Sequence, residues 1–289
     1  MSPNIRGAFL MMASMASFTL NDVCIKATGG ALPLFQLLTL RGILATALIL
    51  GLVHAMGGLD LRIGRQDWVL IGVRSAAEVG AAFFFITALL KMPLANVTAI
   101  LQVLPLTVTL GAALLFREAV GWRRFAAILF GFVGVVLILR PGPEGFNVFA
   151  LYALGAVLCV TVRDLTTRRM SADVPSMTVT LAASVGVLIF SAIATVATEE
   201  WAPLDTRLAL LVAGSSFLII GGYLFSVLVM RTGDISFIAP FRYTGLLWAL
   251  LLGWAVFGHW PDPLTLLGAG IVVASGLFTL YRERLVLQG

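Results

Sequence analysis

Residues 71–90 read IGVRSAAEVGAAFFFITALL, an apolar segment of helix length that contains one arginine and one glutamate. Arg74 and Glu78 are four residues apart, so they lie one turn apart on the same face of a helix. About 20 apolar residues are enough to cross a bilayer. A charge at the middle of the bilayer costs about 2.5–3.5 kcal/mol on insertion scales. If the segment crosses a membrane, this pair must therefore face protein or water rather than lipid.

The composition of the chain indicates that the segment does cross a membrane. Hydrophobic residues make up 60% of the 289 residues, charged residues only 11%, and the mean hydropathy is +1.03. Soluble domains carry about 25% charged residues, and a soluble core could not bury this much apolar surface. We predict an all-α integral membrane protein. The net charge of +5 is spread singly between apolar runs, so it does not indicate nucleic-acid binding.

Breaks at turn residues and charges divide the chain into ten segments of spanning length. Residues 7–20 also resemble the core of a signal peptide, but the apolar run continues to Ile25, which favours a retained first helix. All the loops are short and leave no room for a soluble domain. The predicted spans are 5–27, 34–56, 67–90, 94–116, 122–140, 147–169, 175–197, 206–230, 235–257 and 263–281.

The basic residues of the loops predict the orientation. With ten spans, both termini and the even-numbered loops share one side of the membrane. That side carries most of the loop arginines, including Arg62, Arg65, Arg123 and Arg124. Because basic loops remain inside, we predict that both termini are cytoplasmic.

The sequence contains an internal repeat. A shift of 142 residues aligns NDVCIKATGGALP (21–33) with RDLTTRRMSADVP (163–175), and the offset shortens locally to about 140, where Gln102 meets Arg242. The matched positions include Asp22 with Asp164, Lys26 with Arg168, and Pro33 with Pro175.

This repeat predicts two five-helix units, residues 1–142 and residues 143–289. Because five is odd, two successive units must cross the membrane in opposite directions. Inverted repeats around a central cavity are typical of alternating-access transporters.

Several stretches resemble the EamA family of the drug/metabolite transporter superfamily. They are GGALPLFQLLTLRG at 29–42, the ending LFRE at 115–118, and the glycine-rich fifth and tenth spans. The resemblance covers essentially the whole chain. It implies a ten-helix protein of the bacterial inner membrane that exports or exchanges small metabolites, similar to YddG-type exporters of aromatic and other bulky amino acids. The second repeat has VFGHW at 256–260 in place of LFRE, so any role of Glu118 is not duplicated.

Polar side chains recur at helical spacing on several predicted spans, which predicts a central polar cavity. Ser and Thr in such helices also form ordinary interhelical hydrogen bonds. Pro105, Pro240 and Gly222 are the candidate hinges, although close packing explains most glycines. The candidate cavity residues are Asn21, Asp22, Arg74, Glu78, Thr98, Gln102, Tyr223, Arg242, Tyr243 and Trp248.

The intramembrane charges also allow structural interpretations. Arg74 and Glu78 could form an intrahelical ion pair that fixes one helix to its neighbours, or they could line a cavity wall. Arg41, Arg163 and Asp164 lie nearer to segment ends, where snorkelling or pairing at the helix end is expected. 

The repeat-related acids Asp22 and Asp164 could each pair with the basic residue four positions later. These partners would be Lys26 and Arg168, which would give both pairs a scaffold role.

Enzymatic chemistry is not indicated. Cys24 and Cys159 lie singly in apolar runs, and His54 and His259 lie near loops. No nucleophile-and-base motif, metal-ligand spacing or phosphate-binding loop occurs in the sequence. We therefore predict no catalytic residue, no metal and no cofactor.

The sequence predicts a secondary transporter, either exporter or facilitator, that acts as a monomer in the lipid bilayer. Its small-molecule substrates are expected to be amino acids, with arginines for the carboxylate and amide or acidic groups for the ammonium. A proton could load Glu78 or Asp22, but uncoupled transport is equally consistent. A channel, or an exporter of other small solutes, is the alternative.

Overall fold

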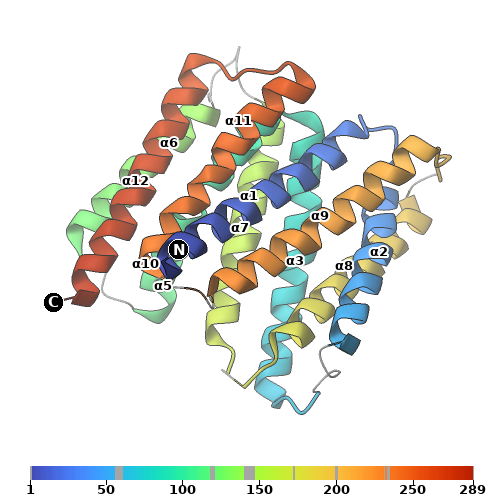
Figure 1. The fold of residues 1–289 in the computed structure, drawn as a ribbon, viewed down its shortest axis with the longest axis horizontal. Coiled ribbons are helices and arrows are strands. Elements are labelled where there is room, and N and C mark those ends of the chain that lie inside the picture. Colours follow the sequence, from blue (N-terminus) through green and yellow to red (C-terminus); the bar gives the residue numbers. More distant parts are fainter. Residues whose placement is uncertain are drawn as a thin grey trace.

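The computed structural model describes residues 2–55, 61–117, 121–139, 147–171, 173–198, 201–230, 232 and 235–288. Within these ranges all regular structure is helical (Figure 1). The predicted repeat boundary at 142/143 and Glu118 lie outside the described residues. The elements are α1 (Pro3–Ala27), α2 (Leu34–Ala55), α3 (Arg65–Lys91), α4 (Leu94–Leu101), α5 (Leu104–Phe116), α6 (Trp122–Leu139), α7 (Val148–Arg169), α8 (Ser176–Thr198), α9 (Thr206–Met230), α10 (Ile235–Ile238), the 3₁₀ helix η1 (Ala239–Tyr243), α11 (Thr244–Phe257) and α12 (Pro263–Gln288).

Ten spans in the described residues are long and apolar enough to cross a membrane, which confirms the predicted number. Eight of them are single helices, and the other two are broken. The fourth span combines α4 and α5, and the ninth combines η1 and α11.

The two broken spans are interrupted at matching places. In the fourth span the backbone N–H of Gln102 caps α4, and Pro105 stands in the first turn of α5. A proline supplies no N–H to a helix, so it suits a helix start and interrupts a continuing helix. In the ninth span Pro240 lies within η1. The second parts of these spans begin at Leu104 and Thr244, which differ by the 140 residues of the predicted local offset.

Helices of the first five spans pack mainly against helices of the last five. The leading pairs are α3 with α7, α1 with α9, α6 with α12 and α2 with α8. Figure 1 shows α6 and α12 along one edge and α2 and α8 toward the opposite edge, with α1 and α9 crossing between them. The core is therefore assembled from both parts of the chain.

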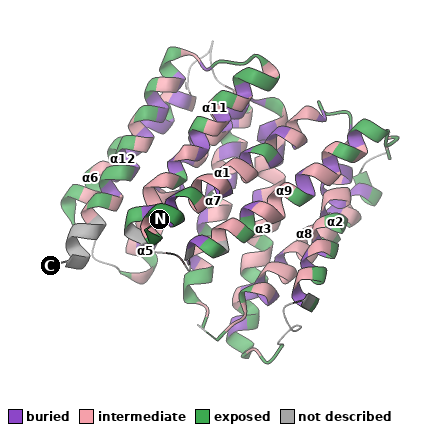
Figure 2. Ribbon diagram, in the orientation of Figure 1, coloured by how far each residue is buried: buried purple, intermediate pink, exposed green. Residues whose placement is uncertain are grey.

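The outer faces of the spans are apolar. Figure 2 shows exposed positions along the outside of α6 and α12. Such positions include Leu129, Phe130, Val133, Leu264 and Leu267. Because lipid tails rather than water cover this surface in a bilayer, the bundle can expose these side chains and keep its polar groups inside.

Candidate functional site

Arg74 and Glu78 both connect α3 to α7. Arg74 Nε donates to Thr167 Oγ1 at 3.1 Å. Glu78 forms an ion pair with Arg163, whose Nη1 lies 3.4 Å from Glu78 Oε2. Within the described part of the chain the two residues form no ion pair with each other. The interpretation as an intrahelical pair is therefore wrong, because α7 packs along α3 and supplies a partner to each residue.

Arg163 belongs to this central cluster rather than to a helix end. Its Nη2 lies 2.9 Å from Asp164 Oδ1, and its Nε donates to the same oxygen at 2.9 Å. The side chains of Arg163, Glu78 and Asp164 are 21%, 20% and 30% exposed, so the network is largely shielded. The expected pairing of Asp164 with Arg168 is not found among the ion pairs of these described residues. Arg163 instead reaches both acids.

A small cavity of about 110 Å³ opens beside this network. Arg41, Arg74, Glu78 and Tyr223 supply its charged and phenolic groups, and α2, α3, α8 and α9 supply its walls. The other lining residues are small or apolar apart from two hydroxyls: Leu38, Gly42, Ala45, Ile49, Ala82, Thr180, Ala183, Ser184, Val187, Ile219 and Ile220.

Two nitrogen atoms of the cavity arginines are buried without a hydrogen-bond partner among the described residues. They are Nε of Arg41 and Nη1 of Arg74. These two atoms have almost no accessible surface, so other atoms of the two side chains line the cavity. Arg41 was expected at a helix end. The structure instead places it in this cavity with Glu78 and Tyr223 as electrostatic neighbours.

Asn21 and Asp22 lie on α1 near Arg41. Asn21 Nδ2 donates to Asp22 Oδ1 at 2.8 Å, and Asp22 interacts electrostatically with Arg41. Lys26 does not pair with Asp22. Its Nζ donates to the carbonyls of Leu89 (2.8 Å) and Met92 (2.6 Å), because α1 ends beside the end of α3.

The predicted residues on the fourth and ninth spans are not among those that line this cavity. Thr98 is half-buried, and Gln102 is buried close to Gly245. Arg242 is exposed and has Asp164 and Arg163 as electrostatic neighbours.

Of the two aromatic residues predicted on the ninth span, Tyr243 is buried and Trp248 is half-buried. Tyr243 is only 6% exposed because its ring lies against Gly276 of α12. Trp248 has a buried Nε1 without a partner among the described residues. Neither residue lines this cavity, so both stay predictions as substrate contacts.

The three hinge candidates occupy different settings. Pro105 and Pro240 stand at the breaks of the fourth and ninth spans. Gly222 is packed against Phe18, and its carbonyl accepts a hydrogen bond from Ser14 at 2.8 Å. The role of all three as hinges stays a prediction.

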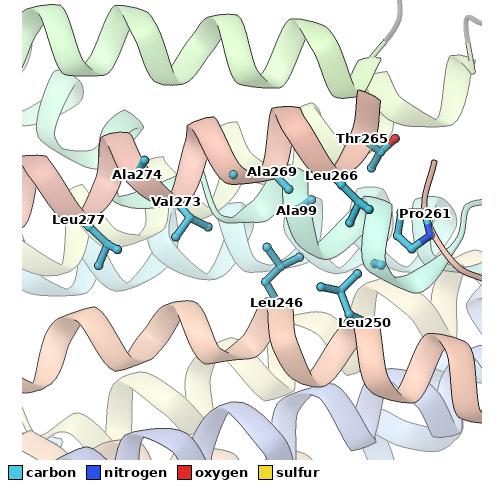
Figure 3. Close-up of a pocket in the computed structure, with 12 residues that line it drawn as sticks. Ala99, Leu246, Leu250, Pro261, Thr265, Leu266, Ala269, Val273, Ala274 and Leu277 are labelled. Atoms are coloured by element: carbon cyan, nitrogen blue, oxygen red, sulfur yellow. The ribbon is translucent and has the colours of Figure 1, made fainter. Parts of the chain in front are cut away.

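A larger cavity of about 340 Å³ lies between α4, α11 and α12. Figure 3 shows Leu246 and Leu250 of α11 facing Leu266, Ala269 and Val273 of α12 across it. No charged side chain lines it, and its one hydroxyl, on Thr265, already donates to Asp262. We therefore take the smaller, charged cavity as the candidate binding site.

Comparison with known proteins decides the family. The model of the EamA-like transporter family matches residues 5–140 and again residues 148–281. The chain belongs to the EamA-like transporter family. This EamA protein is therefore a multi-pass membrane transporter of small metabolites and not an enzyme, as predicted.

The EamA protein is similar along nearly its whole length to curated relatives. It is 29% identical to the S-adenosylmethionine uptake transporter of Rickettsia felis, over 96% of this chain and 92% of the relative. It is also 29% identical to the riboflavin transporter of Vibrio cholerae, over 95% and 92%. Identity to the pseudopaline exporter CntI of Pseudomonas aeruginosa is 25%, over 92% and 93%.

A solved crystal structure supports the fold. It shares 21% sequence identity with this EamA protein, covers 97% of this chain and 98% of its own, and superposes with a TM-score of 0.67. The relatives differ both in solute and in direction, so family membership leaves the substrate to be inferred from the cavity.

Proposed function

We propose that this EamA protein is a secondary transporter of amino acids, including aromatic and bulky apolar ones. The observation that carries the proposal is the charged cavity inside a bundle of apolar spans. A charge costs several kcal/mol in lipid unless water or protein shields it. Such a cavity therefore offers a polar solute a path that the bilayer does not.

The lining of the cavity suits the two parts of such a solute. The guanidinium groups of Arg41 and Arg74 can bind a carboxylate through paired N–H donors. Leu38, Ile49 and Ile219 offer an apolar surface for a side chain. The similarity to S-adenosylmethionine uptake transporters supports this class, because S-adenosylmethionine itself carries an amino-acid end.

We propose that residues 1–142 and residues 143–289 form two inverted units that move against each other. The pattern of helix packing supports this division. In this division α1, α2, α3 and α6 of the first unit correspond to α7, α8, α9 and α12 of the second. If each helix is replaced by its counterpart, the pair α1–α9 becomes the pair α7–α3, and the pairs α2–α8 and α6–α12 map onto themselves. The cavity is lined by α2 and α3 from one proposed unit and by α8 and α9 from the other. Rocking of one unit against the other would expose it alternately to the two sides.

The proposal includes a monomer in the bacterial inner membrane with both termini in the cytoplasm. The excess of loop arginines on the terminal side supports this orientation.

The test is counterflow in liposomes that contain the purified protein. We expect liposomes loaded with an unlabelled amino acid to accumulate the same radiolabelled amino acid, with the strongest signal for aromatic or bulky apolar ones. S-adenosylmethionine and riboflavin serve as comparison solutes, and protein-free liposomes give the background.

Counterflow of riboflavin alone would overturn the amino-acid assignment while leaving a transporter. Repeating the assay with the pH gradient collapsed tests proton coupling. Glu78 is ion-paired with Arg163 and Asp22 is hydrogen-bonded to Asn21, so Glu78→Gln and Asp22→Asn are the variants that test which acid carries a proton.

A further inference from the structure

The acids and bases around the cavity are not evenly matched. Glu78 is the one acidic residue among the lining residues, and its carboxylate is already paired with Arg163. Asp164 is held by the same guanidinium, and Asp22, which does not line the cavity, accepts a hydrogen bond from Asn21 and interacts electrostatically with Arg41. Arg41 and Arg74 keep buried nitrogens without a partner among the described residues.

We propose that Arg41 and Arg74 form a two-point site for a carboxylate, and that this contact, rather than one to an ammonium, anchors the solute. The inference rests on the proposed function, because it names the group by which the transported solute is held. Both arginines line one cavity, from the neighbouring helices α2 and α3. Two guanidinium groups that converge on one anion give charge-assisted hydrogen bonds of defined geometry.

Arg163 acts as a positioning residue in this arrangement. By pairing with Glu78, it occupies the only carboxylate of the cavity lining, which interacts electrostatically with Arg41 but forms no ion pair with it. If Glu78 instead paired with Arg41 or Arg74, one of the two guanidinium groups would no longer be available to a solute. An ammonium group entering the cavity would meet two cations and one carboxylate that is already paired. A carboxylate would meet two guanidinium groups that form no ion pair among the described residues.

The experiment measures binding of benzoate, benzamide and benzylamine to the purified full-length protein in detergent, by calorimetry or by the shift in thermal unfolding. These probes share a ring and differ only in carrying a carboxylate, a neutral amide or an ammonium. We expect benzoate to bind at least about tenfold more tightly than either of the others, as lost hydrogen bonds to a charged group imply.

Single substitutions then assign the site. Arg41→Gln and Arg74→Gln should each weaken benzoate binding by about tenfold or more, whereas Arg41→Lys should retain part of it. The matched control is Arg65→Gln, which removes the same charge from the exposed start of α3 and should leave binding unchanged. Arg163→Gln should weaken benzoate binding through release of Glu78, and the additional change Glu78→Gln should restore it.

If the unmodified protein bound the three probes equally, or preferred benzylamine, the proposed carboxylate site would be wrong. This test needs no variant, so it holds even if a variant fails to fold. Unchanged benzoate binding in folded Arg41→Gln would also overturn the site. The result is separable from the proposed function. Arginine-dependent benzoate binding without amino-acid counterflow would retain the carboxylate site and remove the amino-acid substrate.

Discussion

Arg163 is the residue that joins the charges of α3 and α7. It lies opposite Glu78 and beside Asp164, and its guanidinium reaches both carboxylates. Loss of one member of a fully buried ion pair costs about 3–5 kcal/mol. The cost here should be smaller, because each side chain is about one-fifth exposed.

We expect Arg163→Gln to lower the free energy of unfolding by about 1–3 kcal/mol, since Glu78 would lose its partner in a shielded position. The measurement is reversible unfolding in mixed detergent micelles. Glu78→Gln should cost less in the Arg163→Gln background than in the unmodified protein. Strictly additive effects would show that the two side chains do not interact.

Single residues also show where the sequence was informative and where it was not. Arg74, Glu78 and Tyr223 were predicted as cavity residues and do line the cavity. Arg41 and Arg163 were assigned to helix ends, because their distance from a predicted loop was the only signal available. Their partners come from other helices. Spacing along one helix predicts which face a residue occupies but not which helix will pack against that face.

At the level of elements, the breaks of the fourth and ninth spans were only partly predictable. Pro105 and Pro240 marked the spans that would bend. The residues at which α5 and α11 restart, Leu104 and Thr244, follow the repeat offset instead, since the two prolines are not repeat mates. The spacing of the two breaks therefore agrees with the repeat offset and is not given by the prolines alone.

The contact of α6 with α12 depends on glycines. A Cβ atom added to Gly268 would lie 2.5 Å from the carbonyl oxygen of Gly134, and one added to Gly134 would lie 2.6 Å from that of Gly268. Both obstacles are backbone atoms, so a larger residue could be accommodated only by moving the helices apart. Small residues allow close approach of membrane helices in this way.

We expect Gly268→Ala to destabilise the protein by about 1–3 kcal/mol through overpacking at this contact. Gly270→Ala is the matched control on α12, because a Cβ there meets no atom within 4 Å. It should be neutral or should stabilise by up to about 1 kcal/mol through helix propensity. Thermal unfolding in detergent measures both changes, and equal effects of the two variants would contradict the close contact.

On the scale of the whole molecule, related cation–aromatic contacts occur at its two ends. Lys26 Nζ, at the end of α1, lies 5.7 Å from the ring centre of Phe257 at the end of α11. The guanidinium carbon of Arg168, at the end of α7, lies 5.9 Å from the ring centre of Phe116 at the end of α5. Lys26 and Arg168 are repeat mates, so each end of the molecule carries its own copy of this contact.

We expect Lys26→Met to loosen the end at which α1, α3 and α11 finish, because it removes the hydrogen bonds to Leu89 and Met92. The native Cys24, two residues before Lys26 on α1, should then react several-fold faster with N-ethylmaleimide. Cys159 is the internal control, because it lies against Gly80 of α3, within the α3–α7 contact. An unchanged rate at Cys24, or an equal rise at Cys159, would contradict a local opening.

The overall architecture was more predictable than the site. Composition predicted a membrane protein, the segments between turn residues predicted ten spans, and both agree with the fold and the family. These features depend on average hydrophobicity over about 20 residues, which a sequence displays directly. The cavity depends on a few side chains from four helices, and their meeting follows from packing that no single segment contains.

The pairing of α1 with α9 and of α3 with α7 also bears on biosynthesis. A ribosome makes the first five spans before α7 and α9 exist, so the emerging chain reaches the membrane without the helices that cover its own α1 and α3. Glu78 is then already synthesised, whereas its partner Arg163 is not. We therefore expect the first five spans to contact the insertion machinery or other membrane components until the later helices are synthesised and can pack against them.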